Sequence, residues 1–412
     1  MATLLAMFSF QGKTGLQGKT VLLGVTASIA CYKAAELASL LVKSGAQVKV
    51  LMSSNAREFI SPLVFETLTG SKCYCDTFDR NFAFDVAHVS LAKSAELFIV
   101  APATANFIAK AAGGIADDMI TTTFLAATCH KMIAPAMNTA MWDNAATQEN
   151  IATCKRRGIQ FVEPVTGRLA CADVGKGKMA SPETLLELAS DAVAFDKDLA
   201  GKHFLVTAGP TREAIDPVRF LTNGSSGKMG FALARVAAAR GAEVTLVTGP
   251  VALSDPASPL VHTVRVTTAE QMAREVIEHF DSSDVVVMAA AVADFRPASY
   301  SEHKIKKGAG SLHLDLARTQ DILSYLGQHK RADQILCGFS METENLTGNA
   351  RQKLIDKNLD LIVANDITQE GAGFAHDTNK VTLISREGAK ELPLASKDDV
   401  ALAILDEIAH VL

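Results

Sequence analysis

The chain has 412 residues, of which 48% are hydrophobic and 21% are charged, and its formal net charge is −5. This composition is typical of a folded protein of two or three domains and excludes an intrinsically disordered chain. The negative charge balance gives no overall attraction to nucleic acid or to anionic membranes, so a polyanionic ligand would need a local basic cluster.

The seven cysteines are scattered along the chain and form no C-x-x-C pair, so neither a disulfide framework nor a structural zinc site is expected. No basic residue precedes the apolar stretch at the N-terminus, and no small-residue cleavage site follows it. The longest apolar runs are about half of the roughly 20 residues that a membrane span needs. We therefore expect a soluble, cytoplasmic protein with no membrane or nucleic-acid partner.

The first half of the chain alternates strand patterns with helix patterns. Apolar runs typical of buried strands lie at residues 21–26, 46–52, 97–103 and 131–137. The helix after the first strand ends at Ser44-Gly45, where the glycine can adopt a left-handed cap. Strands and helices that alternate at these lengths predict parallel strands joined by right-handed crossovers.

The same alternation begins again near residue 195. Residues 182–195 predict an amphipathic helix, residues 196–202 form a polar connector, and a new strand pattern starts at His203. We therefore expect an α/β protein with two doubly wound, Rossmann-like domains, residues 1–195 and 196–412.

Three polar residues of the first half follow expected strands. Ligands of open parallel sheets bind beyond the carboxyl ends of the strands, which is where Ser28, Thr104 and Asn138 fall. Ser28 and Thr104 each fit two interpretations: a hydroxyl group beside a phosphate at a helix N-terminus, or an ordinary helix N-cap.

Two further residues of the first half can move protons. His88 lies in an expected helix and is either a base that titrates near neutral pH or a surface or core histidine without such a role. Cys171 lies in a segment whose glycines, Gly167, Gly175 and Gly177, predict a mobile flap. A thiol in such a flap can deliver a proton to a covered substrate.

The motifs of the first half resemble, in order, those of the flavin-dependent cysteine decarboxylases. The resemblance covers roughly residues 18–190 and lies in TASIACYKAAEL, HVSLAKSAEL, APATANFIAKAAGGIADDM, PAMN and LACADVGKGKM. It is strongest to the phosphopantothenoylcysteine decarboxylase half of the bacterial bifunctional coenzyme A biosynthesis proteins. This resemblance implies a flavodoxin-like flavoprotein domain that binds FMN.

The resemblance also implies a role for each candidate residue. His88 is the expected catalytic base, Cys171 the expected proton donor, and Asn138 a catalytic residue that binds the substrate carboxylate or amide beside Met137. The expected FMN-binding residues are Ser28, Ser53, Thr104 and Asn106.

A glycine-spaced turn precedes a helix in the second half. Gly224, Gly227 and Gly230 recur at every third residue, so backbone N–H groups there can approach an anion. Arg219 and Asn223 lie just before this turn and fit either a clamp on phosphate or carboxylate oxygens or ordinary surface positions.

Further charged residues of the second half follow expected strands. The apolar run 284–295 predicts a buried strand that ends at Asp294, where an acid favours a ligand or a metal ion. The lysines of the HKIKK motif (304, 306 and 307) fit either a solvated loop or a site for a nucleoside triphosphate. Lys353 and Lys357 lie four residues apart, hence on one face of a helix.

These segments resemble, again in order, the phosphopantothenate–cysteine ligase half of the same bifunctional proteins. The motifs are GPTRE, DPVRF, SSGKMG, AAAVADF, KIKK and the AND that follows RQK. The resemblance implies a nucleotide-binding domain that activates the carboxylate of 4′-phosphopantothenate with CTP, giving an acyl-cytidylate and pyrophosphate, after which the amine of cysteine displaces CMP. The expected CTP-binding residues are Asp294, Lys304, Thr319, Gln320, Asp321, Ile322, Phe339, Lys353 and Lys357.

The same resemblance assigns the remaining ligands of the second half. Arg219 and Asn223 would hold the acyl intermediate, and Asp294 is the expected ligand of a Mg²⁺ ion that accompanies CTP. The partners of the chain are then small molecules and, by resemblance, further copies of itself in a homo-oligomer built from trimers, such as a dodecamer.

Both halves together predict a bifunctional enzyme that makes 4′-phosphopantetheine from 4′-phosphopantothenate, cysteine and CTP. One alternative is a flavin-fold regulatory module without catalysis, which we would expect to lack His88 or Cys171. Another alternative is a decarboxylase of the C-terminal cysteine of a peptide, which would have no use for a CTP-dependent half.

Overall fold

The computed structural model describes residues 9–10, 13–78, 86–168, 174–306, 313–342, 346–366, 373 and 376–412. Internal contacts divide the chain into two compact units, Met1–Phe195 and Asp196–Leu412. None of the described helices is both long enough and apolar enough to cross a membrane.

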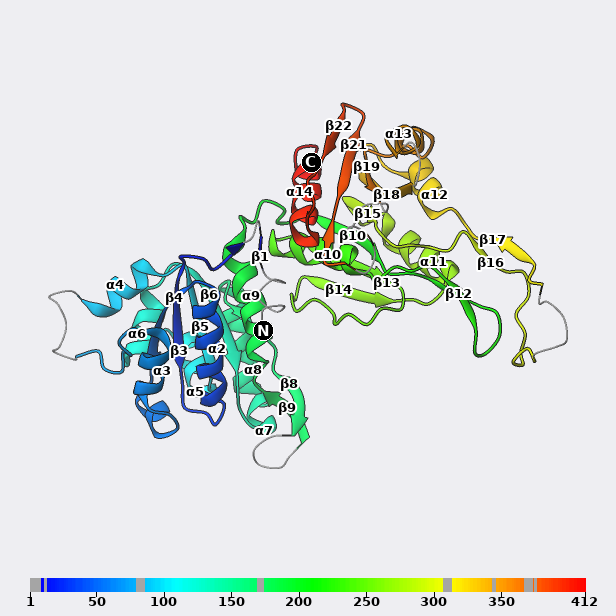
Figure 1. Ribbon diagram of the computed structural model, residues 1–412. Helices are drawn as coiled ribbons and strands as arrows, with labels where there is room; N and C mark the ends of the chain where they lie inside the picture. The colour runs from blue at the N-terminus through cyan, green and yellow to red at the C-terminus, as the bar shows by residue number, and fades with distance from the viewer. Residues whose placement is uncertain are drawn as a thin grey trace. The chain divides into compact units, whose positions relative to one another are not determined.

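The N-terminal unit is built on a sheet of five parallel strands in the order β4-β3-β5-β6-β7 (Figure 1). These strands are β3 (Thr20–Val25), β4 (Gln47–Met52), β5 (Leu97–Ala103), β6 (His130–Pro135) and β7 (Gln160–Phe161). The central strand β5 is buried along its whole length, as expected for a parallel sheet that is covered on both faces. The first four strands coincide with the four predicted from the sequence.

Helices cover both faces of this sheet. They are α2 (Cys31–Lys43), α3 (Pro62–Thr69), α4 (Ala87–Ser94), α5 (Ala105–Gly113), α6 (Met119–Ala126), α7 (Thr139–Trp142), α8 (Ala145–Arg156) and α9 (Pro182–Ala194), with a 3₁₀ turn η1 (Ser54–Glu58). Helices α2, α3 and α9 pack on one face, while α4, α5, α6 and α8 pack on the other around Phe98, Phe107 and Phe124. Gly45 follows α2 with φ +87°, which confirms the predicted left-handed cap.

Two small antiparallel hairpins also belong to the N-terminal unit, as far as its described residues show. One joins β1 (Ser9–Phe10) to β2 (Lys13–Thr14), and the other joins β8 (Val165–Arg168) to β9 (Val174–Lys178). The second hairpin flanks Cys171, which itself lies outside the described residues.

The C-terminal unit contains an eight-stranded sheet in the order β14-β13-β10-β15-β18-β19-β21-β22. Its first six strands are parallel: β10 (His203–Ala208), β13 (Glu243–Thr248), β14 (Val261–Arg265), β15 (Val285–Met288), β18 (Ile335–Glu342) and β19 (Leu361–Asp366). Two antiparallel strands extend the sheet, β21 (Val381–Ser385) and β22 (Ala389–Glu391).

In the described part of this unit, five helices and three antiparallel strand pairs accompany the second sheet. The helices are α10 (Lys228–Ala239), α11 (Ala269–Phe280), α12 (Ile322–His329), α13 (Leu346–Asp356) and α14 (Lys397–Ala409). Helices α10 and α14 pack together, and α11, α12 and α13 cover a separate core around Leu205, Leu336 and Ile362. The predicted fold class, two doubly wound α/β domains, is therefore confirmed. The antiparallel strand pairs are β11 (Arg212–Ala214) with β12 (Phe220–Thr222), β16 (Phe295–Pro297) with β17 (Leu316–Arg318), and β20 (Thr378–Asn379) with β23 (Ala395–Ser396).

The strand expected to run to Asp294 is shorter than predicted. Strand β15 ends at Met288, and residues 289–294 form a loop instead. In this loop the N–H groups of Ala290 and Ala293 donate to the side-chain hydroxyls of Thr207 and Thr211, at 3.1 and 3.0 Å, rather than to the backbone carbonyls of a neighbouring strand. The apolar run therefore located the buried strand but extended it too far, because residues 289–292 are only half-buried and Asp294 is exposed.

Candidate active sites

Four predicted residues of the N-terminal unit lie at one edge of its sheet. Ser28 follows β3, Ser53 follows β4, Thr104 follows β5 and Asn138 follows β6. Because these four strands are parallel neighbours, their carboxyl ends meet at the same edge. This edge is where an open α/β sheet binds its ligands.

Three of these side chains cap helical turns. Ser53 accepts a hydrogen bond from the N–H of Ala56 (3.2 Å), Thr104 from the N–H of Phe107 (3.3 Å) and Asn138 from the N–H of Ala140 (2.8 Å). The N-cap interpretation of Thr104 is therefore correct. Capping uses the hydroxyl oxygens of Ser53 and Thr104 as acceptors and so leaves each O–H as a donor.

Ser28 differs from these three residues. Its hydroxyl oxygen lies 3.3 Å from the N–H of Ala30, in the turn before α2, and no side chain among the described residues caps α2. The N-cap interpretation of Ser28 is therefore wrong. Asn106 lies in the first turn of α5 and is exposed.

Thr26, which the sequence did not single out, joins the ends of β3 and β5. Its hydroxyl donates to the carbonyl of Pro102 (2.8 Å) and accepts from the N–H of Thr104 (2.9 Å). This buried link fixes the position of Thr104 relative to the loop that carries Ser28. The only sequence signal was a hydroxyl residue at the end of the apolar run 21–26.

The β8–β9 hairpin docks against the segment that carries Asn138. The N–H of Met137 donates to the carbonyl of Gly177 at 3.1 Å. Gly177 has φ +149°, and a Cβ atom there would overlap the carbonyl oxygen of Met137. Only glycine fits this close approach without strain.

An ion-pair network holds the base of the same hairpin. Lys176 lies 2.9 Å from Glu163 and 5.3 Å from the ring centroid of Trp142, and Lys155 lies 3.0 Å from the same carboxylate. Burial would raise the pKa of Glu163, but the two ammonium groups outweigh it, so that pKa lies below its ordinary value. The hairpin is therefore fixed at its base beside Met137.

His88 is half-buried in the first turn of α4. No hydrogen bond among the described residues joins it to Asn138 or to the three hydroxyl groups. Its role and that of Cys171 therefore stay predictions.

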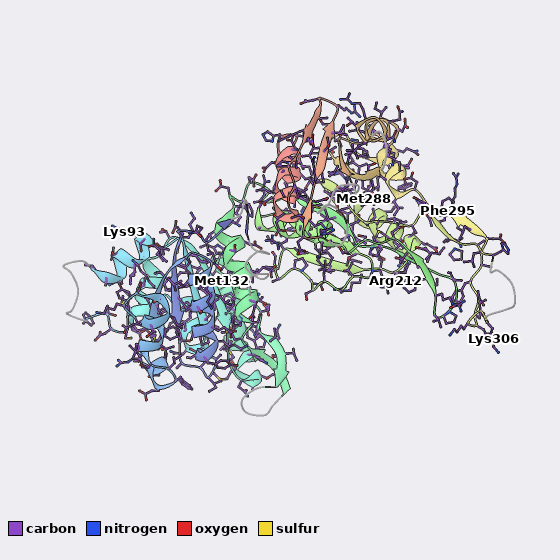
Figure 2. All side chains as sticks on the ribbon, viewed as in Figure 1. Lys93, Met132, Arg212, Met288, Phe295 and Lys306 are labelled. Atoms are coloured by element: carbon purple, nitrogen blue, oxygen red, sulfur yellow. The ribbon has the colours of Figure 1, made fainter. Side chains whose placement is uncertain are left out.

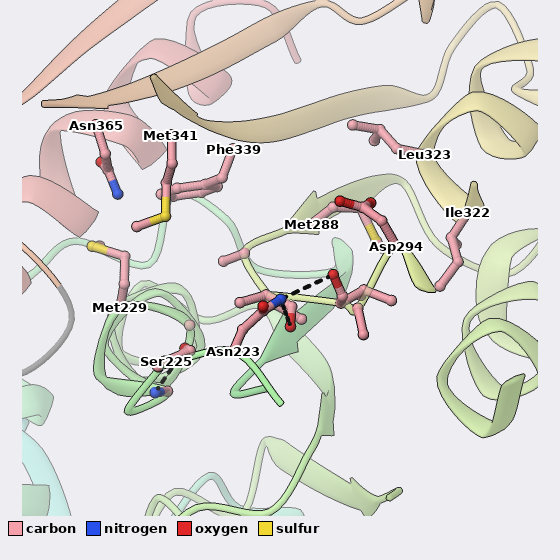
Figure 3. Close-up of a pocket in the computed structure, with 18 of the residues that line it drawn as sticks. Asn223, Ser225, Met229, Met288, Asp294, Ile322, Leu323, Phe339, Met341 and Asn365 are labelled. Atoms are coloured by element: carbon pink, nitrogen blue, oxygen red, sulfur yellow. Dashed lines mark hydrogen bonds between the residues drawn. The ribbon is translucent and has the colours of Figure 1, made fainter. Parts of the chain in front are cut away.

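The C-terminal unit contains a cavity of about 800 Å³ at the carboxyl end of its sheet. Figure 3 shows side chains from several separate segments around it. Eight of the predicted residues line the cavity: Asn223, Asp294, Thr319, Gln320, Asp321, Ile322, Phe339 and Lys357.

The glycine-rich turn places the start of α10 against this cavity. Gly227 is the N-cap of α10 with φ +79°, and no side chain of the described residues caps this helix. Gly230 lies against Ala208 at the end of β10, where a Cβ atom would be 2.6 Å from the Cβ of Ala208. The first N–H groups of α10 are thus positioned for an anion in the cavity.

Asn223 connects two loops of the cavity wall. Its side-chain amide donates to the carbonyls of Ala291 (3.1 Å) and Val292 (3.2 Å), which Figure 3 shows as dashed lines. Asn223 therefore fixes the glycine-rich turn to the loop that ends at Asp294.

The segment 319–322 is also held firmly. The hydroxyl of Thr319 donates to the carbonyl of Ala293 (2.6 Å), and Asp321 caps α12 through the N–H of Ser324 (3.0 Å). Lys357 pairs with the carboxylate of Asp321 at 2.8 Å. Burial would raise the pKa of Asp321, but Lys357 and the N–H of Ser324 outweigh burial and lower that pKa.

Lys397 lines the cavity and was missed by sequence reasoning. It is 7% exposed at the first position of α14, and its ammonium donates to the carbonyls of His376 (2.6 Å) and Gly373 (3.1 Å). Burial, and then the nearby charge of Lys228, lower the pKa of Lys397 to about 8. A lysine in the first turn of a helix faces the positive end of its dipole, a weak signal that could have been noticed.

Three predicted residues do not line the cavity. Lys353 is exposed on α13, 3.5 Å from the hydroxyl of Ser340. Lys304 is exposed on the projection formed by residues 295–306, which starts at β16. Arg219 donates to the carbonyl of Ile305 (3.0 Å) on that projection. Figure 2 labels Lys306 near the outer end of the projection, away from Met288 in the cavity wall.

Family models match both units of the chain. The model described as "Flavoprotein" matches residues 10–193, and the model of the DNA/pantothenate metabolism flavoprotein C-terminal domain matches residues 199–412. The coenzyme A biosynthesis bifunctional protein CoaBC of Bacillus subtilis strain 168 is 50% identical over 397 residues, which are 96% of this chain and 97% of that relative. The chain belongs to the family of bifunctional coenzyme A biosynthesis proteins.

A second full-length relative agrees with this membership. CoaBC of Escherichia coli K12 is 41% identical, over 95% of this chain and 97% of its own length. A crystal structure of the C-terminal domain of CoaBC is 46% identical over 52% of this chain and 97% of that domain, with a TM-score of 0.45. The two full-length relatives and the two family models confirm the resemblance found in the sequence motifs. The chain is a coenzyme A biosynthesis enzyme with a flavoprotein decarboxylase domain and a ligase domain.

Proposed function

We propose that residues 196–412 ligate cysteine to 4′-phosphopantothenate with CTP, and that residues 1–195 decarboxylate the product to 4′-phosphopantetheine. The observation that supports the ligase most strongly is that eight residues predicted for nucleotide or acyl binding surround one cavity. Family membership supports this function over a regulatory module or a peptide decarboxylase.

The ligase cavity would supply the charge balance that carboxylate activation needs. A carboxylate is a poor acyl donor until one of its oxygens becomes part of a phosphate leaving group. The N–H groups at the start of α10 would hold phosphate oxygens, and Thr319, Phe339 and Lys357 would hold the nucleotide. Asn223 would keep the two walls of the cavity at a fixed separation around the acyl-cytidylate.

Asp294 fits a role as a Mg²⁺ ligand. It is an exposed carboxylate in the cavity wall, and the described residues contain no cluster of three or more possible metal ligands. A single carboxylate beside a triphosphate suits Mg²⁺, which keeps several waters and takes its other ligands from phosphate oxygens. Removing divalent cations with EDTA should therefore stop pyrophosphate release and leave decarboxylation of added 4′-phosphopantothenoylcysteine unchanged.

The carboxyl edge of the N-terminal sheet fits FMN. The hydroxyls of Ser28, Ser53 and Thr104 suit a phosphate and a ribityl chain, and α2 offers a helix N-terminus without a side-chain cap among the described residues. The buried hydroxyl of Thr139, next to Asn138, has no hydrogen-bond partner among the described residues. When bound, FMN would oxidise the carbon that bears the substrate thiol, which allows the carboxylate to leave, and would later return the hydride.

The residues of the decarboxylase would bind the substrate and move its protons. Asn138 would hold the substrate carboxylate or amide beside Met137, and His88 would accept a proton before carbon dioxide leaves. Cys171 would donate a proton to the product carbon once the β8–β9 hairpin covers the substrate. A yellow protein with a flavin absorption band would support this half, and a preparation that takes up no flavin would count against it.

The exposed projection supports association between copies of the chain. Lys304 lies on a projection that extends away from the cavity of its own unit, so its ammonium would serve the cavity of a second copy. Apolar side chains are also exposed after β3 and β4, among them Ile29 (62%), Tyr32 (62%) and Phe59 (53%). We propose a cytoplasmic homo-oligomer built from trimers, such as a dodecamer, and a monomeric mass in solution would contradict this.

A further inference from the structure

The projection that carries Lys304 contains residues 295–306 together with strand β17, the residues just before it, and the β11–β12 hairpin. The β11–β12 hairpin lies beside the chain that continues from β16, and the N–H of Ser301 donates to the carbonyl of Ile215 at 3.0 Å. Asp216 and Arg219 of the hairpin also contact Ile305, which lies between Lys304 and Lys306. Figure 1 shows β12, β16 and β17 extending together from the sheet.

Asp216 is the buried centre of this projection. It is 2% exposed, and its Oδ1 accepts hydrogen bonds from the N–H groups of Val218 and Arg219, both at 2.8 Å. Its Oδ2 accepts from the N–H of Ile305 at 3.2 Å, across a separation of 89 residues. The guanidinium of Arg219 donates to the carbonyl of Ile305 at 3.0 Å and lies 3.5 Å from the carboxylate.

Both backbone polar groups of Ile305 are therefore held by the turn at 216–219. A peptide group is planar and includes the Cα atoms on either side. The peptide that contains the N–H of Ile305 also contains the Cα of Lys304, and the peptide that contains its carbonyl also contains the Cα of Lys306. Fixing these two peptides fixes the base of both exposed lysine side chains.

The carboxylate of Asp216 is ionised in this environment. Burial would raise its pKa, but the N–H groups of Val218, Ile305 and Arg219, with the guanidinium of Arg219, together outweigh burial and lower it. Burying an ionised carboxylate costs solvation free energy. A turn at the surface of the projection would form without a buried charge, so the buried Asp216 points to a further role.

We infer that Asp216 is a positioning residue of the ligase: it fixes the peptides on both sides of Ile305 so that Lys304 meets the phosphates at a defined place. The inference rests on the proposed function, because it requires Lys304 to act on CTP. The competing interpretation is that Asp216 only stabilises the turn at 216–219, and that its contact with Ile305 has no consequence for the reaction.

The first test is Asp216→Asn in the full-length, flavin-loaded protein, with pyrophosphate release measured from 4′-phosphopantothenate, cysteine, CTP and Mg²⁺. Asparagine can still accept from Val218 and Arg219 through its oxygen, but it presents an N–H group to the N–H of Ile305. We expect kcat to fall at least tenfold while KM for CTP changes less than threefold, since the cavity itself binds the nucleotide. Asp315→Asn, an exposed carboxylate on the same projection, is the matched control and should stay within twofold of wild type.

A double-mutant cycle separates positioning from stability. Lys304→Arg keeps a cation, and hence a measurable rate, but alters its reach. If Asp216 acts through Lys304, then adding Asp216→Asn to Lys304→Arg should lower kcat for pyrophosphate release less than threefold. A full tenfold loss in that background, or a wild-type rate for Asp216→Asn alone, would overturn the inference.

A second variant covers the case in which Asp216→Asn does not fold. Ile305→Pro removes the backbone N–H that donates to Oδ2 and keeps the carboxylate, its two bonds to the turn and the guanidinium of Arg219. The same loss of kcat at constant KM is expected, and an unchanged kcat would contradict the inference. If Lys304→Gln releases pyrophosphate at the wild-type rate, both the proposed role of Lys304 and the inference about Asp216 fail. If Lys304→Gln releases pyrophosphate slowly but Asp216→Asn does so at the wild-type rate, only the inference about Asp216 is overturned.

Discussion

Replacing Gly177 with alanine should impair decarboxylation and leave ligation intact. Gly177 has φ +149°, a conformation that costs a non-glycine residue about 1–3 kcal/mol. The new Cβ atom would also overlap the carbonyl oxygen of Met137 and push β9 away from it. This movement breaks the hydrogen bond from the N–H of Met137, which contributes about 1 kcal/mol.

These contributions sum to about 2–4 kcal/mol, which corresponds to a 30- to 1000-fold weaker docking of the β8–β9 hairpin, since about 1.4 kcal/mol is a factor of ten. We expect carbon dioxide release from 4′-phosphopantothenoylcysteine to fall to about a tenth of the wild-type rate or less. CTP-dependent pyrophosphate release, which belongs to the other unit, serves as the internal control for folding.

Gly167→Ala is the matched variant in the same hairpin. A Cβ atom at Gly167 would lie 3.7 Å from the Cδ of Lys178, an ordinary van der Waals contact. This variant should decarboxylate within twofold of wild type. If Gly177→Ala were as active as Gly167→Ala, the docking of the hairpin beside Met137 would have no part in catalysis, and the reasoning would be refuted.

Four further variants test other parts of the structure. His88→Asn should stop carbon dioxide release and leave pyrophosphate release unchanged. Cys171→Ser should release carbon dioxide without forming reduced 4′-phosphopantetheine. Normal product from either variant would refute the proton transfer assigned to that residue. Asp321→Ala removes the cap of α12 and the ion pair with Lys357, which together contribute about 1–2 kcal/mol. KM for CTP should therefore rise about 5- to 30-fold. An unchanged KM would show that this loop does not bind the nucleotide. Folding lowers the pKa of Lys397 from 10.5 to about 8. Between these pH values the unfolded chain therefore binds one more proton than the folded chain. The free energy of unfolding should rise with pH over this range by on the order of 2 kcal/mol, after allowance for solvent screening. The free energy of unfolding of Lys397→Met, measured with urea, should not show this rise with pH. If it rose with pH as steeply as that of the wild type, the ammonium would not be buried.

The sequence predicted the positions that depend on local pattern. Ser28, Thr104 and Asn138 follow parallel strands, and apolar runs locate such strands well because both faces are buried. Ser53, which follows β4, came from the motif resemblance alone. The placement of Thr319 and Asp321 in the cavity wall came from motif resemblance alone, since nothing in their periodicity marks a site.

The residues that the sequence did not reveal act through distant partners. Thr26 bonds to residues 76 and 78 positions away, and Asp216 bonds to Ile305 across 89 residues. Lys397 reaches carbonyls that precede it by more than 20 positions. No local pattern encodes these pairings, because they arise only when the sheet brings separate loops together. For the same reason, the sequence could not show that Lys304 stands outside the cavity of its own unit.

The two-step account is tested most directly by one incubation with 4′-phosphopantothenate, carboxyl-labelled cysteine, CTP and Mg²⁺, in which pyrophosphate and labelled carbon dioxide are followed together. The account predicts equal final amounts, with carbon dioxide lagging behind pyrophosphate, and neither product when CTP is left out. Labelled carbon dioxide released without CTP, or pyrophosphate formed with no carbon dioxide from flavin-loaded protein, would contradict it.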